Sequence, residues 1–300
     1  MYKIELYSSN HFKQWNDFIN KSKNGTFLFH RDFMEYHSDR FHDFSLLVFD
    51  ENKLVAVLPA NRVEDTVYSH QGLTYGGLIY SEKLKLTSVV AIFQSILKFS
   101  HENGVSKLHL KMIPYIYHKL PSQELEYALF LSNAKLIRRD TLCVIESSAK
   151  TKIAANRLEG VKKANVNDLK IIETEDFAPF WNKILIPNLE HKFGVKPVHS
   201  LEEISLLKKR YPKNIKHYVV LKGEEIVAGT VLFESDTVIH AQYISAGESK
   251  NELGSLDFLY HYLITNVYIH KKYFDFGISN EEQGRKVNEG LQFWKEGFGA

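Results

Sequence analysis

Hydrophobic and polar positions follow the same order twice along this 300-residue chain. Residues 44–59 and residues 216–231 each read as an apolar strand, a polar turn and a second apolar strand, which predicts two β-hairpins. Each hairpin is followed by a third strand, a loop that contains glycine, a long amphipathic helix and another strand, at an offset of about 170 residues. The repeat predicts two similar domains in tandem, with a ligand-binding cleft between them.

The apolar periodicity also predicts the elements around each hairpin. In the first half we expect a third strand at 67–72, a helix at 86–101, a strand at 106–112, a helix at 124–133 and one or two strands within 134–145. In the second half we expect a strand at 169–173, helices at 176–190 and 200–211, a third strand at 238–245, a helix at 255–270, a strand at 273–276 and a last helix from about residue 288.

Local signals sharpen some of these boundaries. Ser200 and Glu203 have the spacing of a capping box, and Pro187 should bend or end the helix in which it lies. The charged segment 146–165 lacks a strong apolar face and is predicted to connect the domains, as a helix. We therefore assign residues 1–150 and residues 151–300 to the two domains.

Composition narrows the class of protein. A hydrophobic content of 44%, a charged content of 25% and a formal charge of +2 describe a globular chain without the strongly basic balance of many nucleic-acid-binding proteins. We expect no DNA partner. The N-terminus lacks the apolar core of a signal peptide, and no apolar run approaches the roughly 18 residues of a membrane span. We therefore predict a cytoplasmic protein.

Cysteine and histidine positions give no metal or disulfide pattern. The single cysteine, Cys143, excludes an internal disulfide and lies in an apolar run, which predicts a buried and inert thiol. His30, His37 and His42 lack the spacing of a metal site and have no neighbouring cysteine. We predict no metal.

The most specific signal lies near the C-terminus, where Asp275-Phe-Gly277 ends a strand and the motifs Asn288-x-Gly-Leu291 and Lys295-x-x-Phe-Gly299 follow. With the element order, these residues resemble the Fem-like (FemAB/FemX-type) family of tandem GNAT acyltransferases. The resemblance also covers residues 225–229 and 75–77. It implies an α/β (α+β) fold in which each domain has a mixed, mostly antiparallel sheet flanked by helices. It also implies a final strand after Gly299; the sequence ends at Ala300, which would leave a sheet edge unpaired.

The same resemblance makes the C-terminal domain the donor side and suggests an acyl-coenzyme A donor. Lys250, Gly254 and Ser255 stand where GNAT enzymes hold the coenzyme A pyrophosphate, directly before a long helix. Arg285 is a further candidate to grip a phosphate. Glu248 and Glu252 would oppose a phosphate, so an ordinary helix cap is the alternative.

Three residues are candidates for catalysis. Strict alternation on the third strand places Val238, His240, Gln242 and Ile244 on one face and Ile239, Ala241, Tyr243 and Ser245 on the other. Either His240 or Tyr243 could face the acyl group, with the histidine as a base near neutral pH. Asp275 could orient or deprotonate an amine. The alternatives are a packed strand residue for the first two and a turn cap for Asp275.

The N-terminal domain is the acceptor side by resemblance. Its loop with His70, Tyr75, Gly76 and Gly77 would line the acceptor, and Lys295 of the other domain is also a substrate-binding candidate. The alternative for the loop is a tight turn whose glycines satisfy backbone geometry.

Three functions remain open at this point. The first is an acyltransferase that moves an acyl group from acyl-coenzyme A to an amine on a small or sugar-linked acceptor. The second is a Fem-type transferase that uses aminoacyl-tRNA and a cell-wall precursor; it predicts a continuous basic track, which the scattered pairs at 162–163, 208–210 and 271–272 do not obviously form. The third is a catalytically silent module that binds a glycan or peptide. The resemblance connects the first two with cell-envelope or polysaccharide biosynthesis.

Overall fold

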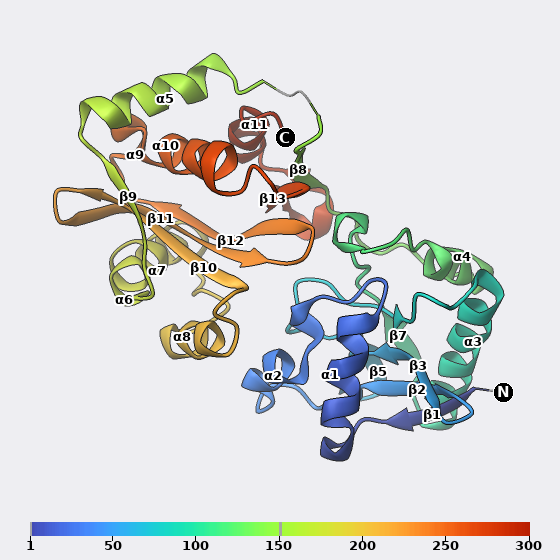
Figure 1. The fold of residues 1–300 in the computed structure, drawn as a ribbon. Coiled ribbons are helices and arrows are strands. Elements are labelled where there is room, and N and C mark those ends of the chain that lie inside the picture. The colour runs from blue at the N-terminus through green and yellow to red at the C-terminus, as the bar shows by residue number, and fades with distance from the viewer. Residues whose placement is uncertain (1, 150–151) are drawn as a thin grey trace. The chain divides into compact units, whose positions relative to one another are not determined.

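The computed structural model describes residues 2–149 and 152–300 and divides the chain into two compact units, Met1–Lys135 and Leu136–Ala300 (Figure 1). Each unit has its own sheet and its own hydrophobic core. This confirms the predicted class, a mixed α/β fold with mostly antiparallel sheets.

The N-terminal unit contains a four-stranded antiparallel sheet in the order β1-β2-β3-β6 and a three-stranded sheet in the order β4-β5-β7. In the second sheet β4 and β5 are antiparallel, whereas β5 and β7 are parallel. Its strands are β1 (Lys3–Leu6), β2 (Leu46–Asp50), β3 (Lys53–Leu58), β4 (Asn61–Val63), β5 (Thr66–Tyr68), β6 (Ile79–Tyr80) and β7 (Lys107–His109). Its helices are α1 (Phe12–Lys21), α2 (Arg31–Met34), α3 (Leu86–Glu102) and α4 (Glu124–Leu131).

The C-terminal unit has a six-stranded sheet in the order β8-β13-β12-β11-β10-β9, antiparallel except between β12 and β13. Helices α5, α9, α10 and α11 cover one face, and α6, α7 and α8 cover the other (Figure 1). The strands are β8 (Leu142–Glu146), β9 (Lys170–Glu173), β10 (Ile215–Lys222), β11 (Glu225–Glu234), β12 (Val238–Ala246) and β13 (Tyr273–Ile278), with a small hairpin of β14 (Asn280–Glu281) and β15 (Lys286–Val287). The helices are α5 (Ala155–Val166), α6 (Ala178–Phe180), α7 (Ile186–Phe193), α8 (Leu201–Arg210), α9 (Lys250–Leu253), α10 (Ser255–Tyr262) and α11 (Glu289–Glu296).

The two hairpins repeat each other in register. The ladder of β2 and β3 shifts register between Val48 and Phe49, and the ladder of β10 and β11 shifts between Val220 and Leu221. The two bulges therefore lie at equivalent positions of the sequence repeat. Because one inserted residue would move every side chain to the opposite face, a shared bulge is strong evidence that the repeat is structural.

Of the two local signals predicted in the second unit, the capping box is confirmed and the helix end is not. The Ser200 side chain accepts from the backbone N–H of Glu203, whose carboxylate accepts from the N–H of Ser200, as in a capping box. Pro187 does not end the helix, because it is the second residue of α7, which continues to Phe193; a π-helical turn at Trp181–Leu185 precedes α7. A second π turn, Leu263–Val267, continues α10.

Two predictions at the junction are corrected. The predicted unpaired edge does not occur, because β8 pairs antiparallel with the outer side of β13. β8 hydrogen-bonds within the six-stranded sheet of the C-terminal unit. The boundary between the compact units along the chain therefore falls after Lys135 rather than after residue 150. The expected connecting helix is α5, and it packs within the second unit.

Candidate functional site

The main candidate site lies where β12 and β13 separate. These parallel strands pair at three positions only, the last being His240 with Asp275. β12 then continues to Ala246 without β13 beside it. A divergence between parallel strands opens the sheet at their carboxyl ends, where α/β proteins commonly bind ligands.

His240 and Asp275 form a hydrogen bond at this point. The imidazole Nδ1 lies 2.9 Å from Oδ2 of Asp275, and the other carboxylate oxygen accepts the backbone N–H of Gly277 at 2.7 Å. Asp275 is fully buried, whereas 12% of the His240 side chain is exposed. An N–H directed at the carboxylate leaves Nε2 as the basic nitrogen of a neutral ring, and Nε2 has no hydrogen-bond partner among the described residues.

Gly277 completes the turn that holds this pair. Its φ is +70°, and a Cβ added there would lie 3.3 Å from Cε1 of His240. The Asp275 carboxylate therefore caps this turn, which was the alternative considered for it, and it also holds the His240 ring, a contact that the sequence did not indicate.

A bulge in β12 corrects the predicted faces of the strand. Leu232 pairs with Ala241, but Val231 pairs with Tyr243, so Gln242 is an extra residue. Strict alternation would place His240 and Tyr243 on opposite faces, whereas the bulge returns Tyr243 to the face of His240. Bulges of this kind are frequent beside active sites, where they redirect a side chain.

Tyr243 itself is packed. Its side chain is buried against Trp181, and its hydroxyl accepts the backbone N–H of His199 at 3.1 Å and lies 2.6 Å from that residue's Nδ1. His199 ends the polar loop 192–199, which the sequence offers only as a minor candidate for the rim of the site. No pattern in the sequence connects it with Tyr243, because the pairing is made by the tertiary fold.

Lys295 is buried beside the turn at Gly277 that follows Asp275. Only 2% of it is exposed, and its ammonium donates to the carbonyl oxygens of Gly277 at 3.2 Å and Ile278 at 2.6 Å. Burial lowers the pKa of Lys295 to about 8, against an opposing effect of Cys143 and Asp275. Lys295 thus ties α11 to the end of β13. Cys143 is buried as predicted, and burial raises its pKa.

The helix start expected to bind a phosphate is covered by α5. Gly254 has φ +65°, and a Cβ there would meet the carbonyl oxygen of Gly160 in α5. Ser255 is fully buried. Arg157 of α5 binds Asp257 of α10 at 2.8 Å, which fixes the two helices together.

Lys250 and Arg285, the two basic candidates for a phosphate, are less buried than Ser255. Lys250 is partly buried and adjoins Lys192 of α7; burial, and next the charge of Lys192, lower the pKa of Lys250. Arg285 is exposed between β14 and β15, and the described residues offer it no ion pair within 4 Å. The structure therefore groups Lys250 with Lys192, the next-to-last residue of α7, and places Arg285 on a separate hairpin.

The N-terminal glycine loop points its large side chains into its own unit. His70 is buried and stacks on His37, with ring centroids 5.2 Å apart, and burial lowers the pKa of His70 to about 3. The Tyr75 hydroxyl lies 3.0 Å from that of Thr26. Gly77 has φ +100°, and Gly76 approaches the backbone of Ser69 so closely that a Cβ would meet its carbonyl oxygen. The glycines satisfy backbone geometry here.

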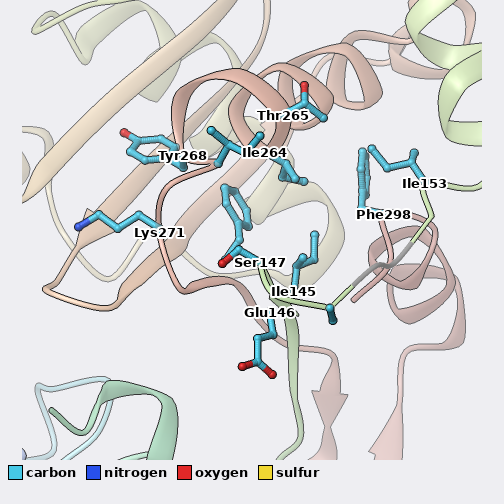
Figure 2. A pocket seen from close by; sticks show the side chains of 12 residues that line it. Ile145, Glu146, Ser147, Ile153, Ile264, Thr265, Tyr268, Lys271 and Phe298 are labelled. Atoms are coloured by element: carbon cyan, nitrogen blue, oxygen red, sulfur yellow. The ribbon is translucent and has the colours of Figure 1, made fainter.

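A small pocket of about 210 Å³ lies elsewhere in the C-terminal unit (Figure 2). Its lining is mainly apolar and includes Ile145, Ile264, Tyr268 and Phe298. Lys271 also lines it, but the ammonium of that residue binds Glu234 at 2.9 Å. The pocket is smaller than the usual 300–1,000 Å³ of ligand sites and contains none of the predicted site residues.

Metal-binding clusters and membrane-spanning helices are both absent from the described residues. No group of three or more His, Cys, Asp or Glu side chains within residues 2–149 and 152–300 could hold a metal ion. Within the same ranges, no helix has both the length and the apolar character needed to cross a bilayer.

Comparison with known proteins identifies the fold. No protein-family model matches the chain, and no curated protein matches its sequence. FemX is 8% identical with a TM-score of 0.62, over 98% of this chain and 93% of FemX. The C-terminal domain of a putative lysylphosphatidylglycerol synthetase from Agrobacterium fabrum is 10% identical with a TM-score of 0.62, over 97% of this chain and 89% of that domain.

A third solved structure is also similar to this chain over nearly its whole length. L-PGS from Bacillus licheniformis is 10% identical with a TM-score of 0.56, over 98% of this chain and 89% of that protein. Identities this low establish a fold and not an activity. The chain has a Fem-like fold of two tandem GNAT-like domains, as the resemblance in its sequence implied.

Proposed function

We propose that this protein is an acyltransferase that forms an amide at the divergence of β12 and β13. The observation that carries the proposal is the His240–Asp275 pair, whose buried carboxylate orients a ring with an available Nε2. A histidine held in one tautomer by a carboxylate is suited to take a proton from an attacking amine near neutral pH.

The proposed step is a direct transfer. The acceptor nitrogen attacks the acyl carbonyl carbon, Nε2 of His240 takes the proton that the nitrogen loses, and the bond to the donor's leaving group breaks. With a thioester donor the leaving thiolate receives that proton. Asp275 stabilises the imidazolium during the reaction, and we place the developing oxyanion at backbone N–H groups of β12 beyond His240, where β13 no longer pairs with it.

We propose acyl-coenzyme A as the donor, with its phosphates at Lys192 and Lys250 instead of at Gly254 and Ser255. Burial, and next the charge of Lys192, lower the pKa of Lys250, so a phosphate bound at these residues would stabilise the charged form of Lys250. The start of α10 lacks this capacity because α5 packs on it.

A second candidate is transfer from an aminoacyl ester, as on tRNA. The covered start of α10 favours it, because such a donor has no pyrophosphate to place there. One protein of this fold is described as a putative lysylphosphatidylglycerol synthetase, a name that joins lysine to a phospholipid.

Calorimetric titration with coenzyme A tests the donor. We expect micromolar binding that weakens about 30-fold in the Lys192→Glu/Lys250→Glu variant and is retained in Lys209→Glu/Lys213→Glu, which has the same net charge. Thiol release from acetyl-coenzyme A with a panel of amines then tests transfer. Absence of coenzyme A binding, together with salt-sensitive binding of aminoacyl-tRNA, would favour the second candidate.

A further inference from the structure

A basic pocket lies in the N-terminal unit, away from the residues discussed so far. Its volume is about 620 Å³, within the usual range of small-molecule sites. Four segments line it: the second half of α1 with the residues after it, the start of β3, the residues after β6, and residues 119–120. Each segment contributes at least one lysine, namely Lys21, Lys23, Lys53, Lys83 and Lys119.

Backbone hydrogen bonds hold these segments in place. Ser22 and Ser81 form a β-bridge, and the N–H of Ser81 donates to the carbonyl oxygen of Val55 at 2.9 Å. The N–H of Lys119 donates to the carbonyl oxygen of Lys23 at 2.8 Å. The lysines therefore extend from a preformed frame, which reduces the entropy lost when a ligand binds.

The charges around the pocket are unevenly compensated. Lys23 is buried and pairs with Glu124 at 2.6 Å, and Asp17 pairs with Lys13. Lys21, Lys53 and Lys83 are exposed, and the described residues provide none of them with an ion pair within 4 Å. Glu82 is the remaining carboxylate of the lining. The pocket thus has an excess of positive charge.

We propose that this pocket binds a small molecule that carries two or more phosphate groups. Several ammonium groups around one hollow match the charge of a diphosphate. Phe18 and Leu54 line the same hollow and offer apolar contact to an organic part of the ligand. A small molecule is favoured over a nucleic acid because the whole chain has a net charge of only +2, without the broad basic face that binding to many phosphates requires.

Calorimetric titration of the full chain with pyrophosphate and with ADP tests the proposal. Both should bind, and the Lys53→Glu/Lys83→Glu variant should lose about 30-fold in affinity for each. The matched control is Lys98→Glu/Lys107→Glu, which makes the same charge change on exposed lysines of this unit outside the pocket. It should bind both probes with nearly unchanged affinity.

Three results would overturn the proposal. One is the absence of binding by either probe, and another is an equal loss of affinity in the control variant. The third is binding of a single-stranded RNA oligomer or of anionic vesicles at the same lysines that pyrophosphate does not displace. The pocket lining contains neither His240 nor Asp275, so the binding assay and the rate assay test different residues, and each proposal can fail alone.

Discussion

The two units share a register but differ at the positions that carry chemistry. Tyr68 and His109 pair across β5 and β7 at the position where His240 and Asp275 pair across β12 and β13. The Tyr68 and His109 rings pack with centroids 5.0 Å apart, and no hydrogen bond between described atoms joins them. In the N-terminal pair His109 stands at the position of Asp275, so no carboxylate is present there to orient a base. A histidine held by a carboxylate is therefore present at this position in the C-terminal pair and not in the N-terminal pair.

The strands around these pairs differ as well. In the C-terminal unit β11 runs unbroken through ten residues and pairs with both β10 and β12. Its counterpart is divided at Pro59 and Ala60 into β3 and β4, which belong to different sheets. A proline cannot donate a ladder hydrogen bond, so it commonly ends a strand. The continuous strand supports the long β12 and its bulge.

The largest predicted effect concerns the two equivalent pairs. We expect His240→Ala or Asp275→Asn to lower the rate of amide formation by about 100- to 10,000-fold, the usual contribution of a general base. Tyr68→Phe and His109→Asn, the matched changes in the other unit, should leave the rate within about twofold. Thiol release from acetyl-coenzyme A in the presence of an amine measures both.

The pH profile separates a base from a structural role. His240→Ala should flatten the acidic limb of the rate profile, whereas a protein that is merely less well folded would keep its shape at lower amplitude. Circular dichroism of each variant provides the folding control. If the N-terminal variants lose as much activity as the C-terminal ones, the proposed asymmetry between the units is wrong.

A second prediction concerns the long helix of each unit. The first residue of α3, Leu86, is 43% exposed, whereas the first residue of α10, Ser255, is fully buried by α5. Gly254→Ala should lower the free energy of unfolding by about 3 kcal/mol or more, because the new Cβ meets the backbone of Gly160 and φ is positive. Gly194 has φ +64° with no atom within 4 Å of an added Cβ, so Gly194→Ala should cost only about 1 kcal/mol.

Urea unfolding measures this difference. An equal loss of unfolding free energy in Gly254→Ala and Gly194→Ala would mean that α5 does not pack closely against the start of α10. In that case the start of α10 could be open to a phosphate, and the donor position proposed at Lys192 and Lys250 would need revision.

The third prediction uses a buried histidine of the C-terminal sheet. His217 is fully buried and stacks on Phe177, and burial lowers the pKa of His217 to about 4; its equivalent in the other hairpin is Ser45, which does not titrate. The native state keeps His217 neutral, while the unfolded chain takes up a proton near pH 6.5. Stability therefore falls as the pH drops below 6.5, by about 2 kcal/mol at pH 5. It levels off near pH 4.

The variant His217→Phe isolates this effect. Between pH 7 and pH 5 the parent protein should lose about 2 kcal/mol more of its free energy of unfolding than the variant loses. An unchanged pH dependence would show that His217 is not held neutral. His70, whose pKa burial lowers to about 3, contributes acid sensitivity in the other unit and remains in both proteins.

Most of the fold follows from patterns in the sequence. Some features depend only on residues that are close in the sequence, so the sequence predicts them: the hairpins, the capping box at Ser200 and the start of α11 at Asn288. The bulge at Gln242 was not predictable, because this residue fits strict alternation and only the partner strand shows that it is extra. The burial of Ser255 was missed for a similar reason: it depends on a helix 90 or so residues earlier in the chain.

The smallest predicted effect lies in the turns of the two hairpins, which differ at the residue with a positive φ. Glu51 adopts φ +53° at the position where the other turn has Gly223 at φ +60°. A residue with a Cβ is disfavoured there, so Glu51→Gly should raise the free energy of unfolding by up to about 1 kcal/mol, and Gly223→Glu should lower it by a similar amount. Urea midpoints measure both. Asn52→Gly is the control, because Asn52 does not have a positive φ and gains nothing from the loss of its Cβ. An increase in stability from Asn52→Gly would show that the handedness of the backbone at residue 51 does not distinguish the two turns.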